Sequence, residues 1–168
     1  MELARRWEAQ DPAALPAPRR PEAPAPAPVL RILLADDNAV NQEVGRLLLR
    51  RLGYTTVDTV ANGHEALAAL RSRPYDVVLM DVHMPLVDGL AATREIRAHL
   101  PATRQPHIVA MTAGALPSDR EACTAAGMDD FFTKPFRADD LRAVLASAAR
   151  RRDLPHALTP APTVRPEP

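Results

Sequence analysis

Five polar residues lie where the sequence passes from an apolar run into a polar segment. They are three aspartates, a threonine and a lysine: Asp36, Asp37, Asp81, Thr112 and Lys134. Carboxylate oxygens are the ligands that Mg²⁺ prefers in proteins. A carboxylate beside such a cation, with a hydroxyl and an ammonium group nearby, has the chemistry of a phosphoryl acceptor. In this interpretation Asp81 is the nucleophile, and the cation and Lys134 neutralise charge that develops on the phosphoryl oxygens.

The elements that must position these residues alternate regularly along the chain. Short apolar runs typical of strands lie at residues 29–35, 54–60, 75–80, 107–111 and 130–133. Segments with helical periodicity separate them, beginning after residue 38, at 63, at 88 and at 118, and the last contains residues 141–148. Such alternation predicts an α/β fold, a parallel sheet with helices on both faces.

Two strand orders are compatible with this alternation, the Rossmann order and the flavodoxin-like order 2-1-3-4-5. No Gly-x-Gly-x-x-Gly follows the first strand, and no Walker A pattern is present, so nucleotide binding loses support. In the order 2-1-3-4-5 the first and third strands are neighbours. Asp36, Asp37 and Asp81 then converge at the carboxyl ends of the strands, where they need a counter-ion.

Finer details of the helices and histidines are also predicted. The first helix is expected to bury the apolar face Val40, Val44, Leu47, Leu48 and Leu52. The fourth helix is expected to open with a capping box at residues 118–121 and to end at Gly127. Because no ligand spacing connects them, the histidines at 64, 99, 107 and 156 are expected to be solvated.

Composition limits the class of protein. The 21 Lys and Arg residues balance 21 Asp and Glu residues, so charge gives no support for binding to nucleic acid or to a membrane surface. The single Cys123 excludes an internal disulfide framework and fits a reducing compartment. No apolar run has the length of a membrane span, and the N-terminal residues lack the apolar core of a secretory signal. We therefore expect a cytoplasmic protein.

Proline marks the domain boundaries. Of the 18 prolines, seven lie in residues 1–28 and five in 151–168, whereas all six glycines lie in 29–150. The two ends contain too few apolar residues to offset the entropy of ordering them. The sequence therefore predicts a disordered Pro/Ala-rich arm at 1–28, a folded domain at 29–150 and a disordered Pro-rich tail at 151–168.

Four segments of the folded unit resemble the response-regulator receiver domain of two-component signalling. They are ILLADDNAVN at 32–41, VVLMDVHMPLVDG at 77–89, MT at 111–112 and TKP at 133–135, in the order and spacing of that family. DDNxxN at 36–41 and AGMDDFFTKP at 126–135 look most like receivers attached to hybrid histidine kinases. The resemblance covers essentially all of 29–150 and implies a (βα)5 flavodoxin-like, three-layer sandwich with strand order 2-1-3-4-5.

The resemblance also implies a role for each site residue. Asp81 becomes the phosphoacceptor, and the Mg²⁺ ligands are Asp36, Asp37, Asp81 and the backbone carbonyl of His83. Thr112 is implied as the switch hydroxyl and Lys134 as the lysine that pairs with the phosphoryl group. Phe131 occupies the aromatic switch position, and a cis peptide bond is implied before Pro135.

The implied function is a regulatory receiver rather than a conventional enzyme. A histidine kinase or a histidine phosphotransfer protein would donate the phosphoryl group. A downstream effector would then bind the face formed by the fourth helix, fifth strand and fifth helix, without direct contact to nucleic acid or membrane.

Two other functions fit parts of the sequence. One is a phosphorylation-independent, receiver-like adaptor that binds a kinase or an output protein, which the complete set of site residues argues against. The other is a small aspartyl phosphatase or phosphotransferase. That class predicts an Asp-x-Asp nucleophile motif and a substrate-covering cap, whereas this chain has Asp81-Val-His83 and no room for a cap.

Overall fold

A computed structural model of the chain describes residues 29–114 and 116–153. Its five strands are parallel and form one sheet in the order β2-β1-β3-β4-β5. The strands are β1 (Ile32–Ala35), β2 (Val57–Val60), β3 (Val77–Asp81), β4 (His107–Thr112) and β5 (Asp130–Thr133). The flavodoxin-like order is confirmed and the Rossmann order is excluded. The predicted arm at 1–28, and the tail from residue 154 onward, lie outside the described residues.

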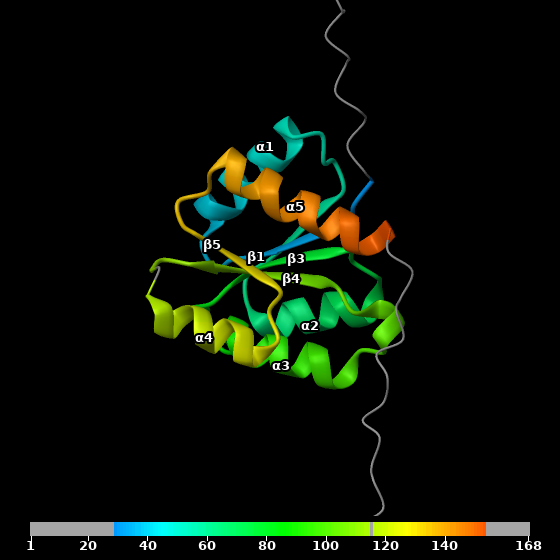
Figure 1. Ribbon diagram of the computed structural model, residues 1–168, viewed down its shortest axis with the longest axis vertical. Coiled ribbons are helices and arrows are strands. Elements are labelled where there is room, and N and C mark those ends of the chain that lie inside the picture. Colours follow the sequence, from blue (N-terminus) through cyan, green and yellow to red (C-terminus); the bar gives the residue numbers. More distant parts are fainter. Residues whose placement is uncertain (1–28, 115, 154–168) are drawn as a thin grey trace, which may run out of the picture.

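Helices cover both faces of the sheet, which gives three layers (Figure 1). On one face lie α1 (Ala39–Arg51) and α5 (Ala138–Asp153), and on the other lie α2 (Gly63–Ser72), α3 (Gly89–His99) and α4 (Pro117–Ala126). A 3-10 turn, η1 (Ala102–Arg104), connects α3 to β4. Helix α5 continues to Asp153, so the disordered tail predicted from residue 151 is wrong for residues 151–153. Within the described part of the chain, no helix combines the length and apolar character needed to cross a membrane.

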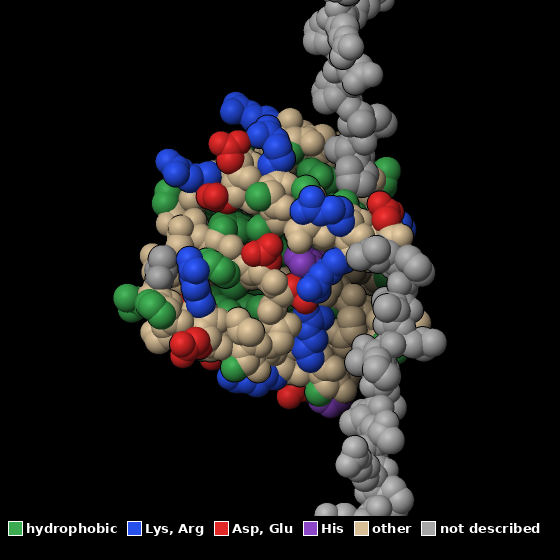
Figure 2. All heavy atoms as spheres, viewed as in Figure 1, with side chains coloured by type: hydrophobic (Ala, Val, Ile, Leu, Met, Phe, Trp, Pro, Cys, Tyr) green, Lys and Arg blue, Asp and Glu red, His purple; other side chains and the backbone are tan. Residues whose placement is uncertain are grey.

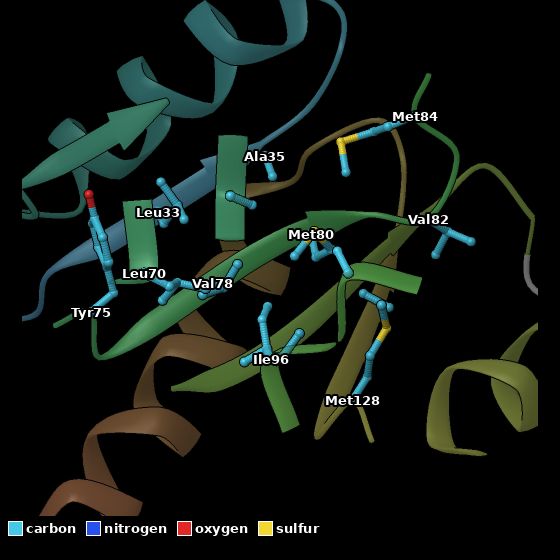
Figure 3. Close-up of a cluster of buried hydrophobic side chains, with 14 of the residues drawn as sticks. Leu33, Ala35, Leu70, Tyr75, Val78, Met80, Val82, Met84, Ile96 and Met128 are labelled. Carbon is cyan, nitrogen blue, oxygen red and sulfur yellow. The ribbon is translucent and has the colours of Figure 1, made fainter. Parts of the chain in front are cut away.

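Each face of the sheet has its own apolar core. Every residue of β1, β3 and β4 is buried, because helices pack on both sides of these strands. Alternate residues of a strand therefore enter different cores: Leu33, Val78 and Met80 meet Ile96 and Met128 on the side of α2, α3 and α4 (Figure 3). The sheet is fixed on both faces, and the carboxyl ends of its strands form a rigid edge.

Helix starts are set by short polar side chains where the sequence supplies them. Asn38, Asn62 and Asp88 each cap a helix by accepting a hydrogen bond from a backbone N–H of its first turn. The capping box predicted for α4 is wrong. That helix begins at Pro117, whose fixed φ suits the first helical position, and its N-cap Leu116 makes no side-chain cap.

The predicted inner face of α1 is wrong in part: Leu48 and Leu52 pack against the core as expected, but the other three residues do not. Gly45 and Leu49 are the buried residues of α1, whereas Val40, Val44 and Leu47 are 69%, 41% and 49% exposed. A Cβ on Gly45 would lie 2.7 Å from a methyl carbon of the Leu34 side chain, so the missing side chain lets α1 approach β1 closely. The helix therefore turns the side with Gly45 and Leu49 toward the sheet, and Val40, Val44 and Leu47 lie on its solvent-exposed side.

His107, the first residue of β4, is buried rather than solvated. Its side chain is 5% exposed, and neither ring nitrogen has a hydrogen-bond partner among the described residues. Asp129 lies 3.7 Å from the His107 ring, but its carboxylate already accepts hydrogen bonds from Arg97, Arg151 and the backbone N–H of Ile108. Burial lowers the pKa of His107 below its ordinary value of 6.5. The negative charge of Asp129 raises this pKa, but by less than burial lowers it.

Acid is therefore expected to destabilise the domain through His107. The unfolded chain binds a proton on this ring more readily than the folded domain does. The neutral ring thus contributes stability that is present above pH 6.5 and lost as the pH falls through the lowered pKa. One such group changes the free energy of unfolding by at most about 1.4 kcal/mol per pH unit. Urea denaturation of the wild type and of His107→Leu, followed by circular dichroism at neutral and mildly acidic pH, measures this component. Equal acid sensitivity in the two proteins would contradict the assignment.

Candidate functional site

The polar residues singled out in the sequence meet at the carboxyl-terminal edge of the sheet. Asp36 directly follows β1, Asp81 ends β3, Thr112 ends β4 and Lys134 directly follows β5. Since β1 and β3 are paired, the aspartates at their carboxyl ends become neighbours. Carboxylate oxygens of Asp36, Asp37 and Asp81 all lie within 4.8 Å of one another. The predicted convergence of three carboxylates is thus present.

Lys134 is the cation of this cluster. Its Nζ lies 2.8 Å from Asp36 Oδ2 and 2.7 Å from Asp81 Oδ2, and both carboxylates are almost completely buried. Burial alone would lower the pKa of Lys134, but the hydrogen bonds to Asp36 and Asp81 outweigh it and hold the pKa above its ordinary value. Burial raises the pKa of Asp81, and Lys134 opposes this rise. Lys134 is charged at neutral pH, and it holds Asp81 in place.

The chain contains 21 basic residues, and Lys134 is its single lysine. Every other cation is an arginine. An ammonium is a compact point charge, whereas a guanidinium is a wider planar fork. One ammonium that donates to two buried carboxylates from different strands needs the compact group, which accounts for the lysine at this position.

Two side chains at the start of α1 hold Asp36, and sequence reasoning did not assign them this role. Asn41 Nδ2 lies 3.2 and 3.3 Å from the two Asp36 carboxylate oxygens. Gln42 Nε2 donates to the backbone carbonyls of Asp36 and Val60, at 2.7 and 3.2 Å. Within DDNxxN, the first Asn therefore caps α1 and the second returns to the carboxylate. The three-residue spacing between these asparagines was the available signal.

Thr112 lies at the same edge, and its hydroxyl is bound locally. Thr112 Oγ1 donates to the carbonyl of Gly114 at 3.0 Å and accepts from the N–H of Gly114 at 3.2 Å. The backbone N–H of Lys134 donates to the Thr112 carbonyl at 2.8 Å, which fixes the ends of β4 and β5 to each other. The hydroxyl must leave Gly114 before it can donate to a group on Asp81.

The other predicted site residues surround this edge. The backbone N–H of His83 donates to Asp81 Oδ1 at 3.2 Å, and the His83 side chain is exposed. The peptide bond between Lys134 and Pro135 is cis. Phe131 lies on β5, half-buried, and packs against the core on the side of α2, α3 and α4.

Gly89 positions the backbone of Asp81. The first residue of α3 passes so close to β3 that a Cβ on Gly89 would overlap the carbonyl oxygen of Asp81, and the Gly89 N–H donates to the Val82 carbonyl at 3.0 Å. Gly89→Ala must therefore displace either α3 or the end of β3. We expect a loss of stability of about 3 kcal/mol, the upper range for overpacking. Gly114→Ala, whose Cβ would meet only the Asp119 carboxylate at 3.2 Å, is the matched control in urea denaturation. Similar losses in both variants would contradict the close-packing argument.

The carboxylate cluster fits Mg²⁺. It offers hard oxygen donors, and three carboxylates face one ammonium, so a divalent cation would relieve the repulsion between them. Lys134 occupies one oxygen each of Asp36 and Asp81. The exposed Asp37 carboxylate forms no hydrogen bond or ion pair with the described residues. Asp37 thus offers unbound oxygens, and Asp36 and Asp81 each keep one oxygen that Lys134 does not bind.

Comparison with known proteins identifies close relatives. The family model of the response regulator receiver domain matches residues 32–146. The two-component system protein A of Emericella nidulans is 44% identical over 121 residues, which cover 71% of this chain and 17% of that protein. The two-component response regulator ORR41 of Oryza sativa subsp. japonica is 40% identical over 121 residues, which cover 70% of this chain and 93% of that protein. The chain thus spans less than a fifth of the Emericella protein but nearly all of the rice regulator.

A solved structure adds information on the metal. The receiver domain of the sensor histidine kinase PA1611 of Pseudomonas aeruginosa PAO1 is 46% identical and superimposes with a TM-score of 0.64. The match covers 71% of this chain and 96% of that domain. That structure has a magnesium ion coordinated in its active-site cleft.

Proposed function

The chain belongs to the response regulator receiver domain family, and from this premise we propose that it accepts a phosphoryl group from a phosphohistidine onto Asp81. One observation carries the proposal: Asp81 is buried at the end of β3, 2.7 Å from the Lys134 ammonium and beside two further carboxylates. Like charges brought together in this way cost folding free energy. A cluster of this kind does not serve to stabilise the fold, whereas a phosphoryl acceptor site requires carboxylates and a cation close together.

The proposed reaction is a nucleophilic displacement at phosphorus. A carboxylate oxygen of Asp81 forms a new bond to phosphorus, and the bond between phosphorus and the imidazole nitrogen of the donor breaks. The nitrogen keeps the bonding electron pair and takes up a proton, and the product is an acyl phosphate. Lys134 already donates to Asp81, so its charge is in place beside the oxygens that carry negative charge during transfer.

We assign the proposed Mg²⁺ ligands to Asp36, Asp37, Asp81 and the backbone carbonyl of His83. When bound, the cation would supply positive charge to the phosphoryl oxygens and to the carboxylates. Two hydrogen bonds keep the Asp36 carboxylate in one orientation. One comes from the Asn41 side chain, and the other comes from the backbone N–H of Asn38, whose nitrogen lies 2.9 Å from Asp36 Oδ1.

Switching is proposed to begin at Thr112. A phosphoryl oxygen on Asp81 offers the hydroxyl a charged acceptor, which is stronger than the neutral carbonyl of Gly114. When the hydroxyl turns, it releases the segment before α4 and leaves space for Phe131 to move inward. The domain thus exists in two populated states, and phosphorylation favours the state in which the face formed by α4, β5 and α5 binds a downstream effector.

The phosphodonor protein is proposed to dock on the exposed apolar stripe of α1, which consists of Val40, Val44 and Leu47. These residues lie at helical spacing on one side of a helix that begins three residues after Asp36. The stripe therefore continues directly from the acceptor site. A histidine kinase or phosphotransfer protein that presents its phosphohistidine on an apolar helical surface would cover both regions together.

Val44→Asp is expected to slow phosphotransfer from such a donor protein about 10-fold, because a charge in the centre of an apolar contact costs more than about 1.4 kcal/mol. Transfer from acetyl phosphate, which needs no docking surface, is expected to stay unchanged. Val29→Asp is the control, since Val29 is 79% exposed and precedes β1 at the opposite edge of the sheet. Equal rates for Val44→Asp and the wild type with the protein donor would exclude the stripe.

The proposed function is tested by incubating the full chain with acetyl phosphate in the presence of Mg²⁺ or of a chelator. Intact-protein mass spectrometry should detect one added phosphoryl group, with Mg²⁺ only. An unchanged mass under both conditions, with the protein folded by circular dichroism, would overturn the proposal and favour the adaptor.

A further inference from the structure

Arg120 forms a contact that the functional site does not use. It lies on α4, and its guanidinium carbon is 4.1 Å from the centre of the Phe131 ring, well within the range of a cation–π interaction. Arg120 is exposed and Phe131 is half-buried. The guanidinium therefore covers the side of the ring that faces α4. The surface above α4, β5 and α5, seen in Figure 2, shows apolar area between charged side chains.

Among the described residues, the Arg120 guanidinium forms this cation–π contact and no hydrogen bond or ion pair. Asp119 and Glu121 precede and follow it on α4, where consecutive side chains point in different directions, and neither forms an ion pair with it. The Arg120 guanidinium donates no hydrogen bond to the described residues. The exposed guanidinium therefore lies on the aromatic ring of the adjacent strand, without a carboxylate partner among the described residues.

The stack connects the two parts of the proposed switch. The Thr112 hydroxyl holds the carbonyl of Gly114, and the segment that contains Gly114 leads directly into α4. The start of α4 has no side-chain cap, and the Thr112 hydroxyl binds both the carbonyl and the N–H of Gly114, three residues before the helix. When Thr112 turns toward Asp81, the start of α4 is released, and Arg120, in its first turns, moves relative to Phe131.

We propose that Arg120 is a positioning residue that holds Phe131 in its half-exposed, resting position. This inference rests on the proposed function, since it assigns a role within the same switch. Inward movement of the ring must break the stack, so Arg120 opposes activation until phosphorylation moves α4. Removal of the guanidinium therefore favours the inward position without any phosphoryl group. From the usual strength of an exposed cation–π contact, the ratio of inward to outward rings rises about two- to five-fold.

The three phenylalanines of the chain make this measurable by NMR of protein labelled with ring-¹³C phenylalanine. The Phe131 signal is assigned from its loss in Phe131→Leu. Without a phosphodonor, its position in Arg120→Ala should shift toward the position that acetyl phosphate and Mg²⁺ produce in the wild type. Arg120→Gln, which keeps a planar group without charge, should shift less. Arg94→Ala removes an exposed arginine from α3 and should leave the signal unchanged.

A kinetic measurement accompanies the spectrum. Labelling by acetyl phosphate should be about two- to five-fold faster in Arg120→Ala, because more molecules already populate the receptive state. Suppose that the wild type gains a phosphoryl group by mass, but that Arg120→Ala has the same resting Phe131 signal and the same labelling rate as the wild type. This result would overturn the role of Arg120 and leave the proposed function intact. A wild type that gains no phosphoryl group would overturn the proposed function and this inference with it.

Discussion

Replacing Asp81 by asparagine is expected to reduce the Mg²⁺-dependent uptake of a phosphoryl group to background. The amide keeps the shape of the side chain but is not a nucleophile toward phosphorus. Asp81 is 4% exposed, and an amide of the same size fits the space, with its oxygen toward Lys134 and its –NH2 group toward the backbone N–H of His83. Intact-protein mass spectrometry after incubation with acetyl phosphate measures the loss.

Asp88→Asn is the matched control for this substitution. Asp88 follows β3 on the same loop and caps α3 through its carboxylate, a role that asparagine fulfils equally well. This variant should be phosphorylated as the wild type is. Full labelling of Asp81→Asn would show that another side chain accepts the group.

The second large effect is expected for Lys134→Ala. The substitution leaves the fully buried Asp36 and the nearly buried Asp81 without their ammonium partner. Removing one partner of a buried charge pair costs about 3 kcal/mol, and we expect this loss of unfolding free energy without Mg²⁺. Loss of the charge beside the phosphoryl oxygens should slow labelling by acetyl phosphate about 100-fold, the effect of removing one preorganised donor.

Lys134→Arg separates charge from geometry. It restores the positive charge, and so should recover most of the stability, but a guanidinium cannot replace one ammonium between two carboxylates, and labelling should stay slow. Mg²⁺ should stabilise Lys134→Ala more than it stabilises the wild type, because it then supplies the missing positive charge. A Lys134→Ala protein as stable as the wild type in a chelator would contradict the assigned electrostatics.

The sequence predicted the fold and the convergence of site residues because both depend on strand ends. Apolar runs of strand length alternate with helical segments, and in a parallel sheet every strand delivers its following residues to the same edge. Asp36, Asp81, Thr112 and Lys134 therefore lie together for reasons visible in the sequence. Their roles in phosphorylation stay proposals.

Other features depend on tertiary packing that periodicity does not encode. The inner face of α1 centres on Gly45, and a residue without a side chain adds nothing to an apolar pattern, so the exposed Val44 was assigned to the core. His107 is polar and starts a strand, yet its side chain is only 5% exposed and lies 3.7 Å from Asp129. No spacing rule connects Arg120 to Phe131, because their contact joins a helix to an adjacent strand.

The most direct test of the account is to locate the acyl phosphate within the chain. Protein labelled by acetyl phosphate and Mg²⁺ is reduced with borohydride, which converts a phosphorylated aspartate to homoserine, and is then digested and sequenced by tandem mass spectrometry. If Asp81 is the phosphoacceptor, homoserine is expected at residue 81 and unmodified aspartate at 36 and 37. Homoserine at 36 or 37, or no homoserine in a folded protein that has been exposed to the phosphodonor, would contradict it.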